Sequence, residues 1–93
     1  MEEKKRAVVT VLGIDRKGII AHVSAALYKN EANILDISQT IVSGYFNMMM
    51  IVDMNDSKKP FGTISEELVQ IGEEIGVVIH CQREEIFSSM HRI

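Results

Sequence analysis

The residue types best suited to binding a small molecule stand in one short turn, residues 13–18, which read Gly-Ile-Asp-Arg-Lys-Gly. An apolar run at 7–12 precedes this turn and a helical pattern at 19–30 follows it, so we predict a strand-to-helix turn. The first amides of a helix lack internal partners and carry the positive end of the helix dipole, which suits an anion. Asp15 stands where a helix cap is expected, and Gly18 allows the backbone to approach a ligand closely. Because Asp15 adds a negative charge that favours an ammonium group, the turn matches an amino acid better than a phosphate.

Other reactive side chains form no recognisable catalytic or metal-binding pattern. His22 has no cysteine or second histidine at metal-ligand spacing, so we expect a solvated or partly packed helix histidine. Cys81 and His80 are neighbours on a predicted strand, where their side chains point to opposite faces. Alternation also separates the middle one of the three methionines at 48–50 from the other two, which favours core and interface packing over soft-metal binding. We therefore predict no enzymatic activity, no metal and no cofactor.

Length and composition indicate one domain over residues 1–93, of which 1–5 form a polar tail. A chain of this size buries roughly 60 to 65 per cent of its unfolded surface, so a partner that covers apolar surface would add stability. The net charge of -3 argues against direct contact with nucleic acid or an anionic membrane, and Glu2 and Glu3 offset the basic cluster at 4–6. The single cysteine and the lack of a signal-peptide pattern or an apolar stretch of ~20 residues predict a cytoplasmic protein.

Hydrophobic periodicity predicts four strands. Those at 6–12 and 46–54 are apolar at odd and even positions alike, as expected for strands in the middle of a sheet. The segment 34–42 alternates between apolar and polar residues, which is typical of a half-buried edge strand, and a tight turn joins it to the next strand as a hairpin. A short apolar run at 77–81 predicts the last strand.

The helices complete a recognisable order. The first, 19–30, is amphipathic, and the second has Thr63 and Glu66 at capping-box spacing with Gly76 as its stop. Apolar residues at helical intervals predict a short helical extension at 84–93. The order strand, helix, strand, strand, helix, strand predicts an α+β, ferredoxin-like βαββαβ sandwich with antiparallel sheet order 4-1-3-2. Helices cover only one face of such a sheet, so we expect a second copy of the chain on the other, as a homodimer or higher homo-oligomer.

This fold supports several functions, and three rivals can be compared with the residues. An RNA-binding version needs aromatic side chains on the central strands, where only Phe46 qualifies. A metal carrier needs paired cysteines in the first turn, and none is present. An acyl-phosphate hydrolase would use an arginine in the first turn and an asparagine on the second strand. Arg16 and Asn33 have the right types, although 13–18 lacks the longer glycine-rich loop that cradles a phosphate.

Short motifs in order along the chain resemble an ACT domain, a small module that binds amino acids and regulates metabolic enzymes or transcription. They are Gly-Ile-Asp-Arg-Lys-Gly-Ile-Ile at 13–20, Ala-Asn-Ile-Leu-Asp-Ile at 32–37 and Tyr-Phe-Asn-Met-Met-Met-Ile-Val at 45–52. Ser-Gln-Thr at 38–40 and the tail Ile-Phe-Ser-Ser-Met-His-Arg-Ile at 86–93 resemble the stand-alone ACT proteins related to the repressor of the glycine cleavage system.

The resemblance implies an effector site at an interface between two domains, formed by the first turn of one and the start of the second strand of the other. Asp15 would take the ligand ammonium, amides near Gly18 would take its carboxylate, and Asn33 of the partner subunit would hydrogen-bond either group. The full predicted set is Asp15, Lys17, Gly18, Ile19, Asn33, Ile34 and Leu35, the last two bordering the ligand side chain. Each residue also has a purely structural explanation: Asp15 as a helix cap, Gly18 as a backbone convenience and Asn33 as a turn residue.

The chain departs from the repressors it resembles in two respects. They carry two such domains and this chain carries one, and it has no helix-turn-helix or other DNA-reading segment. We therefore expect self-association and action through an unidentified protein partner. The alternatives are a ligand-free dimerisation or assembly module and, less favoured, the acylphosphatase-like hydrolase.

Overall fold

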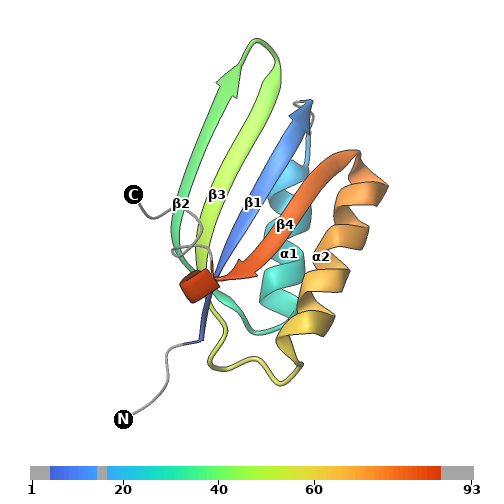
Figure 1. Ribbon diagram of the computed structural model, residues 1–93. Helices are drawn as coiled ribbons and strands as arrows, with labels where there is room; N and C mark the ends of the chain where they lie inside the picture. Colours follow the sequence, from blue (N-terminus) through green and yellow to red (C-terminus); the bar gives the residue numbers. More distant parts are fainter. Residues whose placement is uncertain (1–4, 15–16, 87–93) are drawn as a thin grey trace.

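Four antiparallel strands form one sheet, and two helices cover one of its faces (Figure 1). The computed structural model describes residues 5–14 and 17–86. The elements are β1 (Arg6–Ile14), α1 (Ile19–Lys29), β2 (Asn33–Val42), β3 (Tyr45–Asp53), α2 (Phe61–Ile75) and β4 (Val77–Arg83). The sheet order β2-β3-β1-β4 is the predicted 4-1-3-2 arrangement read from the other edge, so the ferredoxin-like fold is confirmed. Among the described residues, no helix is long and apolar enough to cross a membrane.

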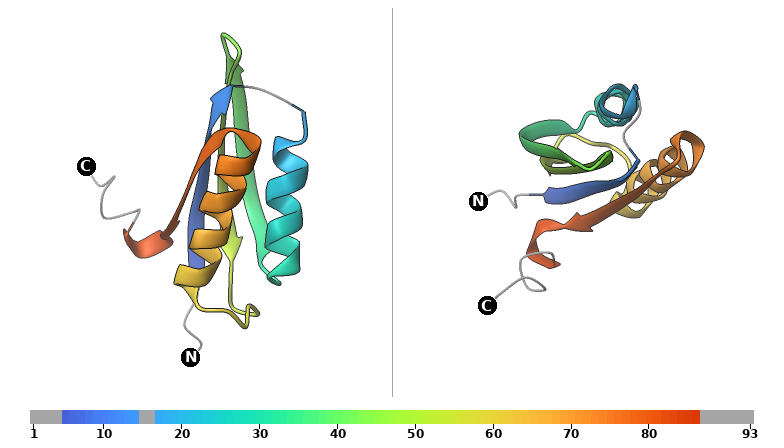
Figure 2. Two further views of the ribbon diagram at one scale, coloured as in Figure 1. Left: turned by 90° about the vertical axis from the view of Figure 1, so that its right-hand side faces the viewer. Right: turned by 90° about the horizontal axis from the view of Figure 1, so that it is seen from above.

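The core lies between the sheet and the helices, and strand alternation decides which side chains enter it (Figure 2). Met48 and Met50 of β3 are fully buried, whereas Met49 between them is 41% exposed on the face that the helices leave open. The predicted separation of the methionines is therefore confirmed. The same alternation buries one side of three strands, namely Ala7, Val9, Val11, Phe46, Met48, Met50, Val52, Val77, Ile79 and Cys81.

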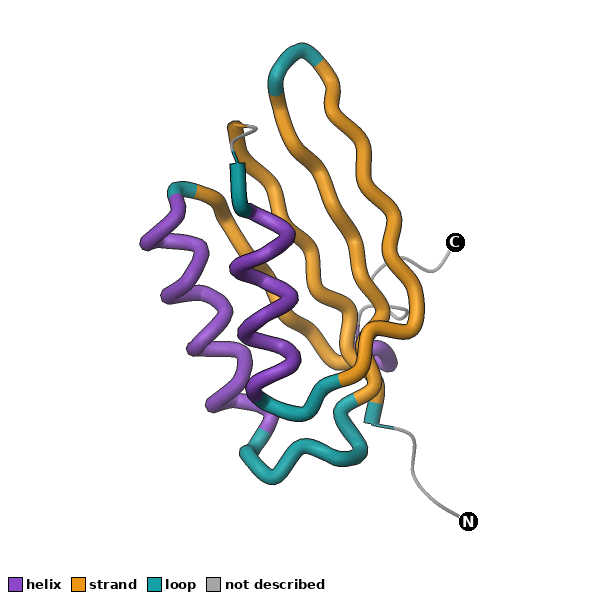
Figure 3. The backbone as a smooth tube through the Cα atoms, turned by 180° about the vertical axis from the view of Figure 1, so that it is seen from behind, coloured by secondary structure: helices purple, strands orange, loops and turns teal. Residues whose placement is uncertain are grey.

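The edge strand β2 is more exposed than its alternation predicts. Ile37 and Ile41 pair with Met50 and Phe46 and so belong to the helix side, yet they are 43% and 59% exposed. The hairpin of β2 and β3 extends beyond the ends of both helices, so the edge strand β2 has little cover along its outer part (Figure 3). The prediction of a half-buried strand was therefore wrong for the isolated chain. A bulge at Leu35 also shifts the register at the start of β2.

The ends of α2 confirm one prediction and correct another. Gly76 follows the helix in the left-handed conformation, with φ 82°, and its amide donates to the Gly72 carbonyl oxygen, which confirms the predicted stop. The capping box does not form, because α2 begins at Phe61, after Pro60 at the N-cap, and Thr63 therefore lies inside the first turn. Proline suits that position since its fixed φ is already compatible with helix entry, but it provides no side-chain cap.

A polar contact joins the end of α1 to α2. Asn30 is buried, and its Nδ2 donates to the Ala26 carbonyl oxygen at 2.9 Å and to Glu67 Oε1 at 3.1 Å. Lys59 Nζ donates to the other oxygen of the same carboxylate at 2.7 Å. These hydrogen bonds, that of Lys59 first, hold the pKa of Glu67 below its ordinary value. The ionised Glu67 therefore stabilises the folded state at neutral pH, and this stabilisation is lost as the pH falls through the lowered pKa.

The first and last described residues of the chain, Lys5 and 84–86, lie at the same end of the sheet. A helical turn at 84–86 follows β4 and lies on the side of the sheet away from α1 and α2 (Figure 2). The remainder of the predicted extension, 87–93, lies outside the described residues, as does most of the predicted polar tail at 1–5. Lys5 is described, and its backbone is held by the loop after β3: its amide donates to Asn55 Oδ1 and its carbonyl oxygen accepts from the Met54 amide.

Two glycines of α2 make a matched test of this packing. A Cβ at Gly72 would lie 2.7 Å from the Val77 carbonyl oxygen, whereas a Cβ at Gly62 would meet nothing within 4 Å. We expect Gly72→Ala to lower the free energy of unfolding by ~1–3 kcal/mol, because overpacking outweighs helix propensity. Gly62→Ala should raise it by up to ~1 kcal/mol. Urea denaturation measures both, and equal stability of the two variants would contradict the close approach of α2 to β4.

Candidate functional site

The predicted ligand-binding turn lies where β1 ends and α1 begins. Lys17 and Gly18 are described, whereas Asp15 and Arg16 lie outside the described residues, so their predicted roles stay predictions. Gly18 occupies the N-cap position with φ 87° and ψ 0°, a left-handed conformation that strains any residue with a Cβ. Its carbonyl oxygen accepts hydrogen bonds from the His22 amide at 2.9 Å and from His22 Nδ1 at 2.7 Å. His22 therefore stabilises the turn by these hydrogen bonds while its ring stays exposed, which agrees with the predicted solvated or partly packed helix histidine.

The first turn of α1 is left open to an anion. Among residues 5–14 and 17–86 no side chain caps it, and none of the residues in this turn is acidic. Ile19 contributes only backbone here, because its side chain is buried in the core. The uncompensated amides and the helix dipole together make this end electropositive.

The other predicted half of the site lies at the start of β2. Asn33 is exposed and begins the strand, and the bulged Leu35 is also exposed. Ile34 is partly buried and packs against the core, so its side chain faces inward. Asn33 and Leu35 are thus the side chains that this segment offers to another molecule.

The two halves are far apart within one chain. Ile14, at the end of β1, pairs with Tyr45, whereas Asn33 pairs with Asp53 at the other end of β3. Eight residues of extended strand separate these two levels by roughly 26 Å. One chain therefore cannot close the site on a small ligand. The same separation disfavours the hydrolase, whose asparagine and arginine would have to act on one phosphate.

The open face of the sheet carries a mixed surface rather than a catalytic cluster. Ser38, Met49, Thr10 and His80 form one cross-strand row, and the row beside it is Thr40, Asn47, Leu12 and Val78. Phe46, the aromatic residue considered for base stacking, is buried on the helix side, so it cannot stack on a nucleic acid. Within 5–14 and 17–86, no group of three or more His, Cys, Asp or Glu side chains is placed to hold a metal ion.

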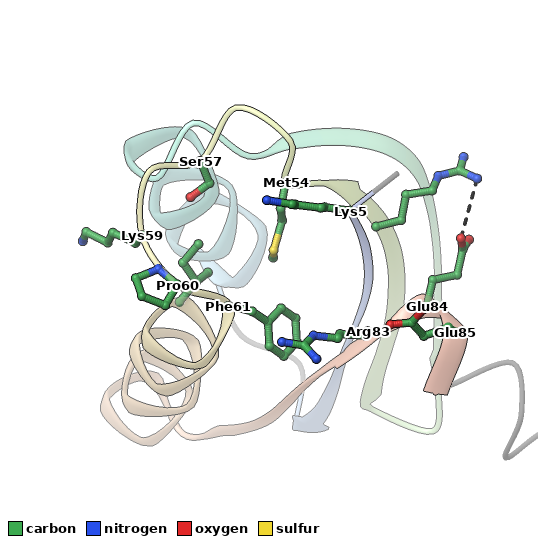
Figure 4. Close-up of a pocket in the computed structure, with 11 residues that line it drawn as sticks. Lys5, Met54, Ser57, Lys59, Pro60, Phe61, Arg83, Glu84 and Glu85 are labelled. Carbon is green, nitrogen blue, oxygen red and sulfur yellow. Dashed lines mark ion pairs between the residues drawn. The ribbon is translucent and has the colours of Figure 1, made fainter. Parts of the chain in front are cut away.

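Sequence reasoning missed a pocket of about 490 Å³ at the end of the sheet where β1 begins and β4 ends (Figure 4). Its lining combines cationic, apolar and hydroxyl groups, among them Lys5, Met54, Ser57, Phe61 and Arg83. The basic cluster at 4–6 was the available signal, but it was interpreted as part of a solvated tail. The β1–β4 register, which pairs Ala7 with Arg83, brings these distant segments together.

This chain matches two curated relatives over nearly their whole length. Residues 5–82 match the sequence profile of the ACT domain. A UPF0237 protein of Bifidobacterium longum is 56% identical over 88 residues, which cover 95% of this chain and 98% of the relative. A UPF0237 protein of Methanocaldococcus jannaschii is 52% identical with the same coverage.

Solved structures agree with this match. An ACT domain protein from Streptococcus pneumoniae superposes with a TM-score of 0.80 at 38% identity, covering 91% of this chain and 96% of that one. A protein provisionally named a glycine cleavage system transcriptional repressor gives a TM-score of 0.74 at 23% identity. It is covered over only 47% of its length, and at this identity the similarity concerns the fold alone.

The reactivity of the Cys81 thiol shows whether this cysteine is an activated nucleophile. Cys81 is buried on the core side of β4, and burial raises the pKa of its thiol from 9.0 to about 11. We expect Ellman's reagent at about pH 8 to label the native protein at least roughly a hundredfold more slowly than the urea-unfolded chain, because so little thiolate is present. Equally fast labelling of both states would contradict an inert, structural cysteine.

Proposed function

Because the chain belongs to the ACT domain family, we propose that it is a regulatory module that binds an amino acid between two copies of itself and signals to another protein. The observation that carries this proposal is the division of the predicted site. An electropositive turn stands at one end of the sheet and the exposed Asn33 at the other. A two-fold axis that pairs opposite ends of two chains creates two complete sites, as symmetric dimers do.

The edge of β2 is better suited to such a pairing than the open face of the sheet, where the sequence alone predicts the second copy. It is ten residues long, contains no lysine or proline, and pairs with β3 on one side only. Exposed edges of this kind tend to pair with another strand. Antiparallel pairing of two β2 strands around Ile37 places the partner's Asn33 near Ile41, at the level of Gly13. It also covers Ile37 and Ile41, which the helices leave exposed.

Each part of an amino acid has a counterpart in this arrangement. The open amides at the start of α1 take the carboxylate, with Lys17 beside them, and Asp15 takes the ammonium. The partner's Asn33 hydrogen-bonds either group, and the partner's Leu35 borders the ligand side chain. The state of the dimer is then reported to a separate protein, a metabolic enzyme or a component of transcription.

Thermal unfolding against each of the twenty amino acids, at millimolar concentration, tests the ligand. A ligand that binds only the folded dimer stabilises it by ~2.7 kcal/mol at a hundred times its dissociation constant, so we expect one or two amino acids to raise the midpoint. No shift with any amino acid would leave dimerisation without a ligand, and the chain would be an assembly module.

Mixing two defective variants tests whether each site needs two chains. Asp15→Ala and Asn33→Ala should each abolish binding of the amino acid found above, because each removes one half of every site. After unfolding and refolding together, half of the dimers are mixed and each mixed dimer holds one intact site, so about one quarter of the binding capacity should return. Isothermal titration calorimetry measures it. No recovery, with mixed dimers shown by native mass spectrometry, would place the site within one chain.

A further inference from the structure

The pocket at the end of β1 and β4 has a composition that the amino acid site does not use. Three apolar side chains, Met54, Phe61 and Ile64, lie in its lining, and none of the predicted ligand residues takes part. It stands at the end of the sheet opposite the electropositive turn, since β1 begins there and reaches Gly18 only beyond its other end. It is therefore a separate feature of the same chain.

Among the residues that the structure describes, the pocket lining carries an excess of positive charge. Lys59 is held by Glu67 at 2.7 Å, and Arg6 pairs with Glu84 at 3.7 Å. Outside these two ion pairs, the charged residues of the lining are Lys5 and Arg83, which are positive, and Glu85, which is negative. Figure 4 shows the charged ends of Lys5 and Arg83 turned toward the middle of the pocket, while Lys59 points away.

Two further groups favour an anion at the same place. The first turn of α2 begins at Phe61, and among the described residues it has no side-chain cap and contains no acidic residue. The Thr63 amide donates to the Pro60 carbonyl oxygen, so the amides of Phe61 and Gly62 and the helix dipole remain for an anion. Ser57 also lines the pocket, and its buried hydroxyl oxygen has no hydrogen-bond partner in the part of the chain that the structure describes. A buried hydroxyl without a partner is costly, and a bound acceptor would satisfy it.

The apolar part of the lining determines what else the ligand carries. The guanidinium of Arg83 lies 5.1 Å from the centre of the Phe61 ring, which orients the cation and leaves it over an apolar wall. Pockets of this size typically bind organic molecules that combine a few polar anchors with apolar surface. We propose that this pocket binds a small organic anion, a phosphate or carboxylate on an apolar body, held by Lys5, Arg83, Ser57 and the start of α2.

Four probes separate the parts of this proposal: phenyl phosphate, phenylacetate, inorganic phosphate and phenol. Amide resonances of Ser57, Phe61 and Gly62 in nuclear magnetic resonance spectra report binding at the pocket. We expect phenyl phosphate, phenylacetate or both to shift these resonances saturably at up to about 10 mM, and at least about tenfold more tightly than inorganic phosphate or phenol. The stronger of the two probes identifies the anionic group.

Charge reversal then assigns the binding to named residues. Lys5→Glu and Arg83→Glu should each weaken binding of the stronger probe by at least about tenfold, since each replaces a charge-assisted contact by repulsion. Lys58→Glu is the matched control, because it makes the same charge change next to Ser57 and Lys59, whereas Lys58 itself is not among the residues that line the pocket. It should change the affinity less than about twofold.

Three results would overturn the proposal. They are no shift at the pocket with either organic anion, shifts confined to the open face at residues such as Leu12 and Val78, or equal weakening by Lys58→Glu and the two pocket variants. None of these results bears on the amino acid site, because that site is tested with the twenty amino acids and with variants of Asp15 and Asn33, neither of which lines the pocket. The thermal midpoints of the three lysine and arginine variants show whether each is folded.

Discussion

The hydrogen-bonded ladders of β3 are the constraint on which the other features of this chain depend. β3 pairs antiparallel with β1 on one side and with β2 on the other, so β1 and β2 run in the same direction. The turn after β1 and the start of β2 must then lie at opposite ends of the sheet. The separation of the two predicted half-sites follows from strand direction alone. No rearrangement of side chains could close it.

The fold could be predicted because alternation and topology agree. Strands that are apolar on both faces belong in the middle, and right-handed crossovers place the same two strands there. The two predictions that were wrong concern local detail, namely the start of α2 and the burial of β2. Thr63 and Glu66 have capping-box spacing, but Pro60 starts α2 one turn earlier than that spacing implies. Ile37 and Ile41 have core-facing positions, but their burial depends on how far the helices reach, which periodicity does not contain.

The two candidate sites, the turn after β1 and the pocket beside β4, also differ in how far local sequence could indicate them. The turn was predictable because its residues are contiguous, and a glycine with φ 87° at Gly18 explains why that residue type stands there. The pocket was not predictable, since Lys5, Ser57 and Arg83 come from segments far apart in sequence. Only the pairing of Ala7 with Arg83, and the hydrogen bond from Lys5 to Asn55, bring them to one place. Basic side chains that are far apart in sequence show no recognisable pattern until the strand register places them side by side.

A site shared between two chains constrains how such a module regulates. The core between sheet and helices is closely packed, with Val9, Met48 and Leu68 fully buried. A bound amino acid therefore has little scope to change the conformation within one chain. In the proposed dimer, its effect would fall on the association of the two chains instead. If the ligand contacts both chains, it strengthens the dimer by the same factor by which dimerisation strengthens its own binding. Under this proposal the protein partner would need to distinguish only the paired from the unpaired chain, and the β2 edge, open in one state and covered in the other, is the difference we propose.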